Sequence, residues 1–155
     1  MNTENTNWGQ SVTAVVIRDK KVLLARHTYG GGKGMLIIPG GYVEKGETPQ
    51  DAVVREFKEE TNITILPKSI IGIRFNQHDW YIAFSADYVG GTEHSDGDEN
   101  DLVIWLDIEE AFSRADVPDL TKSLIQCAMT GTGLERITYQ GNHPPCSLYG
   151  IITEE

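Results

Sequence analysis

Hydrophobic and polar residues alternate in short runs along much of this chain, and glycine, proline, asparagine or aspartate residues separate the runs. Runs of this kind predict β-strands. The predicted strands are residues 11–18, 21–25, 35–38, 65–75, 80–89 and 102–106, with one or two more in residues 136–153. Asp19 and Lys20 lie between the first two runs, which are therefore expected to form a hairpin. A glycine-rich loop at residues 29–34 follows, and the Pro-Gly-Gly turn at residues 39–41 is expected to stop the third strand.

Three other stretches carry apolar residues at the spacing of an α-helix. The first begins after Thr48, because threonine is a good N-cap, Pro49 suits the first helical position and Asp51 lies three residues after the cap. Its predicted apolar face consists of Ala52, Val53 and Phe57. The other two predicted helices are residues 108–114 and 119–129. Strands on both sides of the first helix, followed by further helices, predict a single α/β domain.

Length and composition limit the class of protein. A chain of 155 residues fits one domain, and we predict a flexible N-terminal leader at residues 1–10 and a single domain at residues 11–155. The net charge of −10 disfavours binding to a nucleic acid polymer or to an anionic membrane. No apolar run approaches the roughly 20 residues of a membrane span, and the polar start lacks the features of a signal peptide. These observations predict a cytoplasmic protein with no membrane partner.

One part of the first helix is unusually rich in acids. Glu56 and Glu60 are four positions apart and Glu59 lies three positions after Glu56, so all three carboxylates reach one edge of the helix. Like charges placed in this way repel one another. A hard divalent cation needs several carboxylate oxygens at close quarters, and it turns the repulsion into attraction. The acids therefore predict a metal site.

The acidic segment also resembles the Nudix box, G-x5-E-x7-R-E-U-x-E-E-x-G-U, in which U is apolar. The matching residues are Gly41, Glu47, Arg55, Glu56, Phe57, Glu59, Glu60 and Ile63. The one departure is Asn62, where the box has glycine. This position follows the helix end, where a left-handed backbone is favoured, and asparagine is the best replacement for glycine there. The resemblance covers about residues 11–130 and implies the Nudix fold, an α/β/α sandwich with a mixed β-sheet.

The resemblance implies a pyrophosphohydrolase that cleaves a diphosphate bond in a nucleoside diphosphate linked to another moiety, with Mg²⁺ or Mn²⁺ as cofactor. By the same resemblance, Glu56 and Glu60 would bind the metal directly, and Glu59 would bind it directly or through a water. The carbonyl of Gly40 would complete the set. The Pro-Gly-Gly turn supports this role of Gly40, because glycines let a backbone oxygen approach a ligand closely. Gly41 is assigned to the substrate-binding residues.

Three further charged residues receive roles from the resemblance. Arg55 and Glu47 would form an ion pair that braces the box loop against the helix. The alternative is a surface ion pair worth about 0–1 kcal/mol. Glu99 resembles an acidic residue that precedes a strand in this family and serves as metal ligand or general base. The alternative for Glu99 is a solvated acid in the loop of residues 90–101.

Two cations, Arg26 and Lys33, flank the glycine-rich loop opposite the expected metal cleft, and we predict that they hold substrate phosphates. Two aromatic residues, Trp80 and Tyr81, follow a turn, where an aromatic ring can stack on a base. Core packing is nevertheless the prediction for both of them, and also for Trp105.

A second hypothesis is a catalytically silent Nudix module that binds or senses a nucleotide. Such modules usually lose glutamates of the box, and this chain keeps them, so the hydrolase is favoured. A third hypothesis, an isomerase on the same fold, needs additional residues that the sequence does not identify.

The sequence limits the substrate only to a small phosphorylated molecule. Hydrolases of the ADP-ribose type often carry a proline beyond the box, and His78 and Asp79 occupy that region here, which disfavours this type. The type that removes oxidised nucleotides is also compatible with the box. Homodimers are common in the family, so the resemblance allows a homodimer.

Overall fold

The computed structural model describes residues 9–140 and 146–151. The strands of these residues, in chain order, are β1 (Gly9–Arg18), β2 (Lys21–His27), β3 (Leu36–Ile37), β4 (Gly40–Tyr42), β5 (Thr64–Phe75), β6 (Asp79–Gly90), β7 (Asn100–Asp107), β8 (Glu135–Ile137) and β9 (Leu148–Gly150). The helices are α1 (Pro49–Thr61), α2 (Ile108–Ser113) and α3 (Asp119–Met129). The strands and helices predicted from the sequence are present, with small shifts at their ends.

Among the described residues, seven strands form one mixed sheet in the order β3-β2-β1-β6-β5, with β4 beside β1 and β7 beside β2. β1 and β6 run parallel, and the other pairs are antiparallel. Between β1 and β2, Asp19 and Lys20 have φ values of 52° and 63°. Two successive positive φ values are typical of a tight hairpin turn, so the predicted hairpin is confirmed. β8 and β9 pair with each other, which confirms the strands predicted in the tail.

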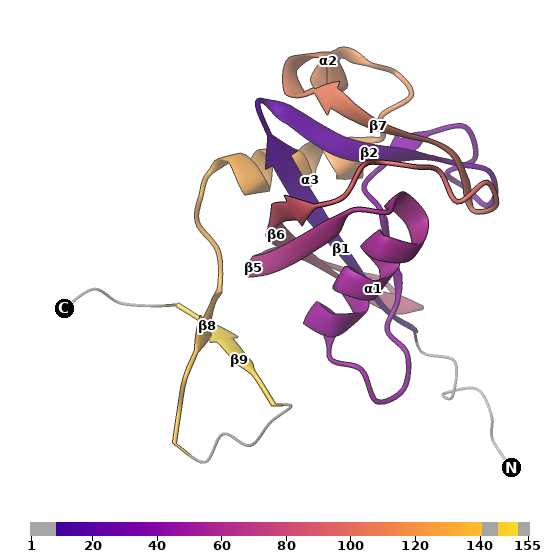
Figure 1. Cartoon of the computed structure of the whole chain (residues 1–155). Helices are drawn as coiled ribbons and strands as arrows, with labels where there is room; N and C mark the ends of the chain where they lie inside the picture. The colour runs from indigo at the N-terminus through magenta and orange to yellow at the C-terminus, as the bar shows by residue number, and fades with distance from the viewer. Residues whose placement is uncertain (1–8, 141–145, 152–155) are drawn as a thin grey trace, which may run out of the picture.

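Helices cover both faces of the sheet, with α1 in front of it and α3 behind it in Figure 1. On the α1 face, Phe57 packs in a buried cluster with Val12 and Phe84. On the other face, Ala111 of α2 and Ile125 of α3 belong to a second buried cluster. The predicted α/β/α sandwich with a mixed sheet is therefore confirmed. In the part of the chain that the structure describes, no helix is both long and apolar enough to cross a lipid bilayer.

The start of the domain differs from the prediction. Residues 1–8 of the predicted leader lie outside the described residues, but Gly9 and Gln10 belong to β1. The Gly9 amide donates a hydrogen bond to the His78 carbonyl at 3.0 Å, and Gln10 pairs with Trp80. The local sequence at Gly9 and Gln10 has no strand pattern. Backbone hydrogen bonds and pairing with residues far along the chain hold these two residues in β1.

The turn predicted at residues 39–41 is also partly wrong, because Gly40 and Gly41 belong to strand β4. β4 pairs with β1 through Gly40 opposite Thr13 and Gly41 opposite Val12. A Cβ atom on Gly40 would collide with the Val12 carbonyl oxygen, so glycine is what permits this close approach. Glycine after proline usually marks a turn, and local sequence does not show that a neighbouring strand continues the pairing.

The core position predicted for Trp80 is wrong, because this side chain is 43% exposed. Trp80 lies at the start of β6 and contacts Phe75 of β5 edge to face, with ring centroids 5.5 Å apart. Tyr81 and Trp105 are partly buried and pack against the core clusters, as predicted. Whether an aromatic residue of a strand is buried depends on what packs over it, and the local sequence does not contain that information.

Candidate active site

Helix α1 carries most of the candidate site, and local bonds fix both of its ends. The Thr48 hydroxyl accepts a hydrogen bond from the Asp51 amide at 3.3 Å, so the predicted N-cap is confirmed. At the other end, Asn62 has φ 64° and ψ 16°, and its amide donates to the Lys58 carbonyl. The left-handed conformation expected at Asn62 is therefore confirmed. Phe57 is fully buried, which fixes the rotation of α1 about its axis and leaves the glutamates on another side.

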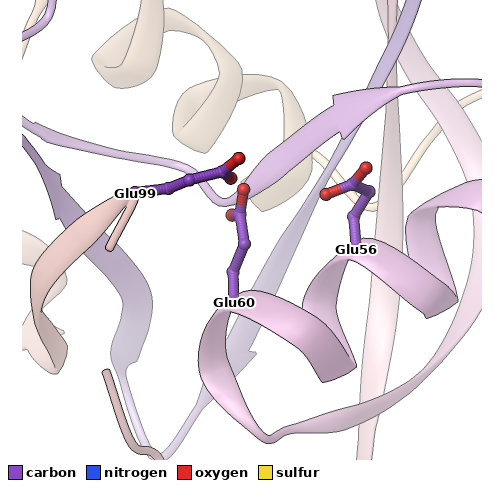
Figure 2. A group of neighbouring side chains, drawn as sticks. All are labelled: Glu56, Glu60 and Glu99. Atoms are coloured by element: carbon purple, nitrogen blue, oxygen red, sulfur yellow. The ribbon is translucent and has the colours of Figure 1, made fainter. Parts of the chain in front are cut away.

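Three carboxylates converge beside α1 (Figure 2). Glu56 and Glu60 project from successive turns of α1, and Glu99 reaches them from the segment before β7. One oxygen of each residue lies within 4.8 Å of the others. Glu60 is buried, Glu56 is partly buried and Glu99 is exposed, so the group opens to solvent on the side of Glu99.

The crowding of these acids changes their protonation. Burial, a hydrogen bond with Glu99 and the charge of Glu56 raise the pKa of Glu60 to about 9. Burial also raises the pKa of Glu56, against the opposing effect of Arg55. The Gly40 amide donates to Glu60 Oε2 at 3.3 Å and favours the charged form, but it does not reverse the shift. A cation among the three carboxylates would offset their repulsion.

Arg55 forms the ion pair with Glu47 that the sequence predicted. Its Nε and Nη2 bind the two Glu47 oxygens at 2.7 and 2.9 Å, and Nη2 also donates to the Tyr42 carbonyl at 3.1 Å. Nη1 binds Glu56 and Glu59 at 3.1 Å each. The hydrogen bonds between Arg55 and Glu47 lower the pKa of Glu47 and raise the pKa of Arg55. One guanidinium therefore holds the box loop and two glutamates of α1 together.

The two glycines of β4 bring the backbone close to the carboxylates. A Cβ atom on Gly41 would collide with the carboxyl group of Glu56, so glycine provides the space that Glu56 occupies. Gly40 contacts Glu60 through its amide. The metal-binding role of the Gly40 carbonyl and the substrate-binding role of Gly41 stay predictions.

Three other predicted site residues, Glu59, Arg26 and Lys33, are not part of the group of three carboxylates. The Glu59 side chain is 58% exposed and binds Arg55, and it is not part of the group that Glu56, Glu60 and Glu99 form. Arg26 Nε binds Asp101 at 2.7 Å. Lys33 is exposed in the glycine-rich loop. The roles of these residues in metal or phosphate binding stay predictions.

Sequence reasoning missed one residue beside the site, Asn100. This residue is 1% exposed, and its Nδ2 donates a hydrogen bond to the Glu60 carbonyl at 2.9 Å. The sequence shows only an asparagine in an acidic loop, where such residues are usually solvated. A buried amide at this position becomes visible only when β7 and α1 are placed together.

The fold and the three carboxylates define an α/β/α protein with a candidate divalent-metal site. The family model described as NUDIX domain matches residues 8–126, and the chain therefore belongs to the Nudix family of hydrolases. It is 38% identical over 104 residues to an ADP-ribose pyrophosphatase from Methanocaldococcus jannaschii, an alignment that covers 63% of this chain and 61% of the relative. It is 34% identical over 122 residues to the NAD-capped RNA hydrolase NudC from Vibrio atlanticus, which covers 74% of this chain and 43% of the relative.

Solved structures agree with this assignment. The fold is similar to that of a NUDIX hydrolase from Nitrosomonas europaea, with a TM-score of 0.72 and 25% identity over 86% of this chain and 99% of the other. It is also similar to a MutT NUDIX hydrolase from Burkholderia pseudomallei, with a TM-score of 0.67 and 19% identity over 76% of this chain and 95% of the other. The chain spans less than two thirds of the length of the two curated relatives above.

Proposed function

We propose that this chain is a metal-dependent hydrolase that cleaves a diphosphate bond in a nucleoside diphosphate linked to another moiety. The observation that carries the proposal is the convergence of Glu56, Glu60 and Glu99, with oxygens within 4.8 Å of one another, beside an intact set of box glutamates. Three acids at this separation repel one another unless protons or a cation intervene. Modules that only bind a nucleotide usually lose glutamates of the box, and this chain keeps Glu56, Glu59 and Glu60.

The residues present fit Mg²⁺ or Mn²⁺. Hard divalent cations prefer carboxylate oxygens, and Gly41 leaves room for the Glu56 carboxylate beside the strand. Glu56 and Glu60 would hold the ion with Glu99 as a third carboxylate, and Glu59 and the Gly40 carbonyl stay predicted as further ligands. When bound, such an ion polarises a phosphoryl oxygen and makes a bound water more acidic.

Glu99 is the residue that we assign to proton transfer. It is exposed, it comes from a different segment than the α1 glutamates, and its carboxylate lies beside Glu60. In its charged form, a carboxylate in this position can orient the attacking water and accept its proton. Arg55, which Glu47 holds by two hydrogen bonds, orients Glu56 through its Nη1 group.

We assign the substrate phosphates to Arg26 and Lys33. Arginine binds phosphate oxygens by paired hydrogen bonds, whereas lysine acts as a point charge. Arg26 binds Asp101 through its Nε, and no other residue in the described part of the chain forms a hydrogen bond with its terminal nitrogens, which can therefore bind a phosphate group while the ion pair persists.

The names of the two curated relatives supply two candidates for the substrate. We propose ADP-ribose as the first candidate, because the relative with 38% identity is named ADP-ribose pyrophosphatase. We give this identity more weight than the absence of a proline in the region of His78 and Asp79, which disfavours ADP-ribose. A second candidate is NAD-capped RNA, from the NudC relative, but the net charge of −10 disfavours binding of the RNA portion.

A turnover screen tests the proposal. Purified protein is incubated with ADP-ribose, NAD-capped RNA, nucleoside triphosphates and dinucleoside polyphosphates, each with Mg²⁺, with Mn²⁺ and with EDTA. We expect release of phosphorylated products from at least one compound, only when metal is present. Glu60→Gln should abolish this release and keep the melting temperature (Tm), because glutamine has nearly the same size but cannot supply a carboxylate to the metal.

The matched control is Glu109→Gln, an exposed glutamate in the first turn of α2, which should turn over substrate like the parent. Equal turnover by Glu60→Gln and the parent would show that the carboxylate group is not the catalytic centre. Binding without turnover of every compound would favour the silent module instead.

A further inference from the structure

The strand that delivers Glu99 contains an extra residue. β2 and β7 pair with Arg26 opposite Leu102, but the next residue of β2, His27, pairs with Asn100. Asp101 is therefore a β-bulge. Residues paired across a sheet face the same side, so Leu102 and Asn100 face opposite sides although they are two positions apart. The bulge turns Asn100 toward α1.

The bulged residue is held in place by its own ion pair. Asp101 Oδ1 binds Arg26 Nε at 2.7 Å. Arg26 belongs to the strand opposite the bulge, so the contact ties the extra residue back to β2. Both side chains are about half exposed, so the pair is weak in energy but favours this register over a regular one.

Asn100 connects three parts of the site. Its Nδ2 donates to the Glu60 carbonyl at 2.9 Å, which joins β7 to the last turn of α1. The backbone amide of Asn100 donates to Asp96 Oδ1 at 3.1 Å, and its backbone carbonyl accepts from Ser95 Oγ at 2.9 Å. The carbonyl of Glu99 accepts from the Thr28 amide at 3.1 Å. The backbone on both sides of the Glu99 side chain is therefore fixed.

Asn100 keeps one buried hydrogen bond at the cost of one unpaired buried oxygen. Its Oδ1 is buried and has no hydrogen-bond partner among the residues that the structure describes. Burial of an unpaired carbonyl costs free energy, and a leucine of similar size would avoid that cost. What leucine cannot supply is the hydrogen bond to Glu60.

We infer that Asn100 is a positioning residue, which ties the start of β7 to the C-terminal turn of α1 and so keeps the Glu99 carboxylate beside Glu60. The inference rests on the proposed function, since it takes Glu99 as part of the metal site. Asn100 acts through Glu99, so its loss should weaken metal binding without unfolding the domain.

Mn²⁺ alone is a sufficient probe. The free-ion signal in electron paramagnetic resonance gives the dissociation constant (Kd) for the full chain, well below its Tm. We expect Asn100→Leu to raise the Kd by about 10- to 100-fold, as for other residues that orient metal ligands, while the metal-free Tm falls by only a few degrees, because the Glu60 carbonyl loses its donor. Asn100→Ala should give the same loss and serves if the leucine variant folds poorly.

A double-mutant cycle tests the route through Glu99. Glu99→Gln should raise the Kd by itself, and adding Asn100→Leu to it should change the Kd by less than about twofold, because residues that act as a unit are not additive. Gln50→Leu is the matched control. This substitution removes the side-chain amide of Gln50 in α1, which donates a hydrogen bond to Ser147 at 2.8 Å. The variant should bind Mn²⁺ like the parent.

The outcomes separate this inference from the proposed function. A parent-like Kd for Asn100→Leu and Asn100→Ala, or multiplied effects in the cycle, would overturn the positioning role. A parent-like Kd for Glu60→Gln would instead overturn the metal site itself, and the positioning role with it.

Discussion

At the residue scale, Gly41 leaves free the space that the Glu56 carboxyl group occupies. A Cβ atom on Gly41 would meet the carboxyl group of Glu56. We predict that Gly41→Ala turns this group away and weakens Mg²⁺ binding by about tenfold or more. The fold should persist, because the end of a glutamate side chain can move. Calorimetric titration with Mg²⁺ measures the effect.

Gly90→Ala provides the comparison, since among the described residues no heavy atom outside Gly90 and its two chain neighbours lies within 4 Å of a Cβ built at Gly90. This variant should bind Mg²⁺ like the parent. If Gly41→Ala also does so, the space beside Gly41 has no role in the placement of Glu56.

The ion pair between Glu47 and Arg55 predicts a pH dependence of stability. The hydrogen bond to Arg55 lowers the pKa of Glu47 below its ordinary value of 4.5. A carboxyl with a lowered pKa in the folded state contributes stability above its unfolded pKa, and this contribution is lost as the pH falls through the folded pKa. Glu47→Gln should therefore lower the Tm most at neutral pH, and the difference from the parent should shrink in acid.

Thermal unfolding of the parent and of Glu47→Gln, measured from neutral pH down to below the ordinary glutamate pKa of 4.5, tests this prediction. Glu109→Gln, at an exposed site of α2, should differ from the parent by a small and nearly constant amount. A constant difference for Glu47→Gln as well would mean that its effect does not come from the charge of Glu47.

At the element scale, the C-terminal end of α1 depends on a residue that tolerates a left-handed backbone. Asn62 has φ 64° and its side chain also donates to the Thr92 carbonyl at 2.9 Å. We predict that Asn62→Ala lowers the free energy of unfolding by about 1–2 kcal/mol, the cost of this conformation for other residues. Asn62→Gly should cost less. Urea denaturation of both variants gives the comparison, and equal losses would mean that the Thr92 contact dominates.

The elements also show what the sequence can predict. Thr48, Pro49 and Asp51 define the start of α1 within a few residues of chain, so this boundary was predicted correctly. β4 was not predicted, because its pairing depends on β1, which lies far away in the sequence. For the same reason Asn100 was missed, since only the contact with Glu60 distinguishes it from a solvated loop residue.

At the scale of the whole molecule, metal binding should be linked to folding. A ligand that binds only the folded state stabilises it by about 2.7 kcal/mol at a concentration of 100 times its Kd. Millimolar Mg²⁺ or Mn²⁺ should therefore raise the Tm of the parent. The double variant Glu56→Gln with Glu60→Gln should lose this rise, and differential scanning calorimetry with and without metal checks both results. No shift in the parent would indicate a charged surface rather than a metal site.

The architecture of the whole molecule was predicted through a local motif. Charged positions at fixed spacing between Gly41 and Glu60 resemble the Nudix box, and the mixed sheet between helical layers followed from that resemblance. The placement of Glu99 beside Glu60 was only one of two interpretations, because it depends on the bulge at Asp101.

The parallel pairing of β1 with β6 also has a consequence for synthesis on the ribosome. Gly9 to Val16 of β1 pair with Asp79 to Ala86 of β6, so the central strand is translated well before its main partner. At about 5–20 residues per second, the interval is roughly 4 to 14 s. All five strands of the main sheet path precede Glu99 in the chain. The nascent chain therefore acquires the third carboxylate of the site only after the whole path has been translated.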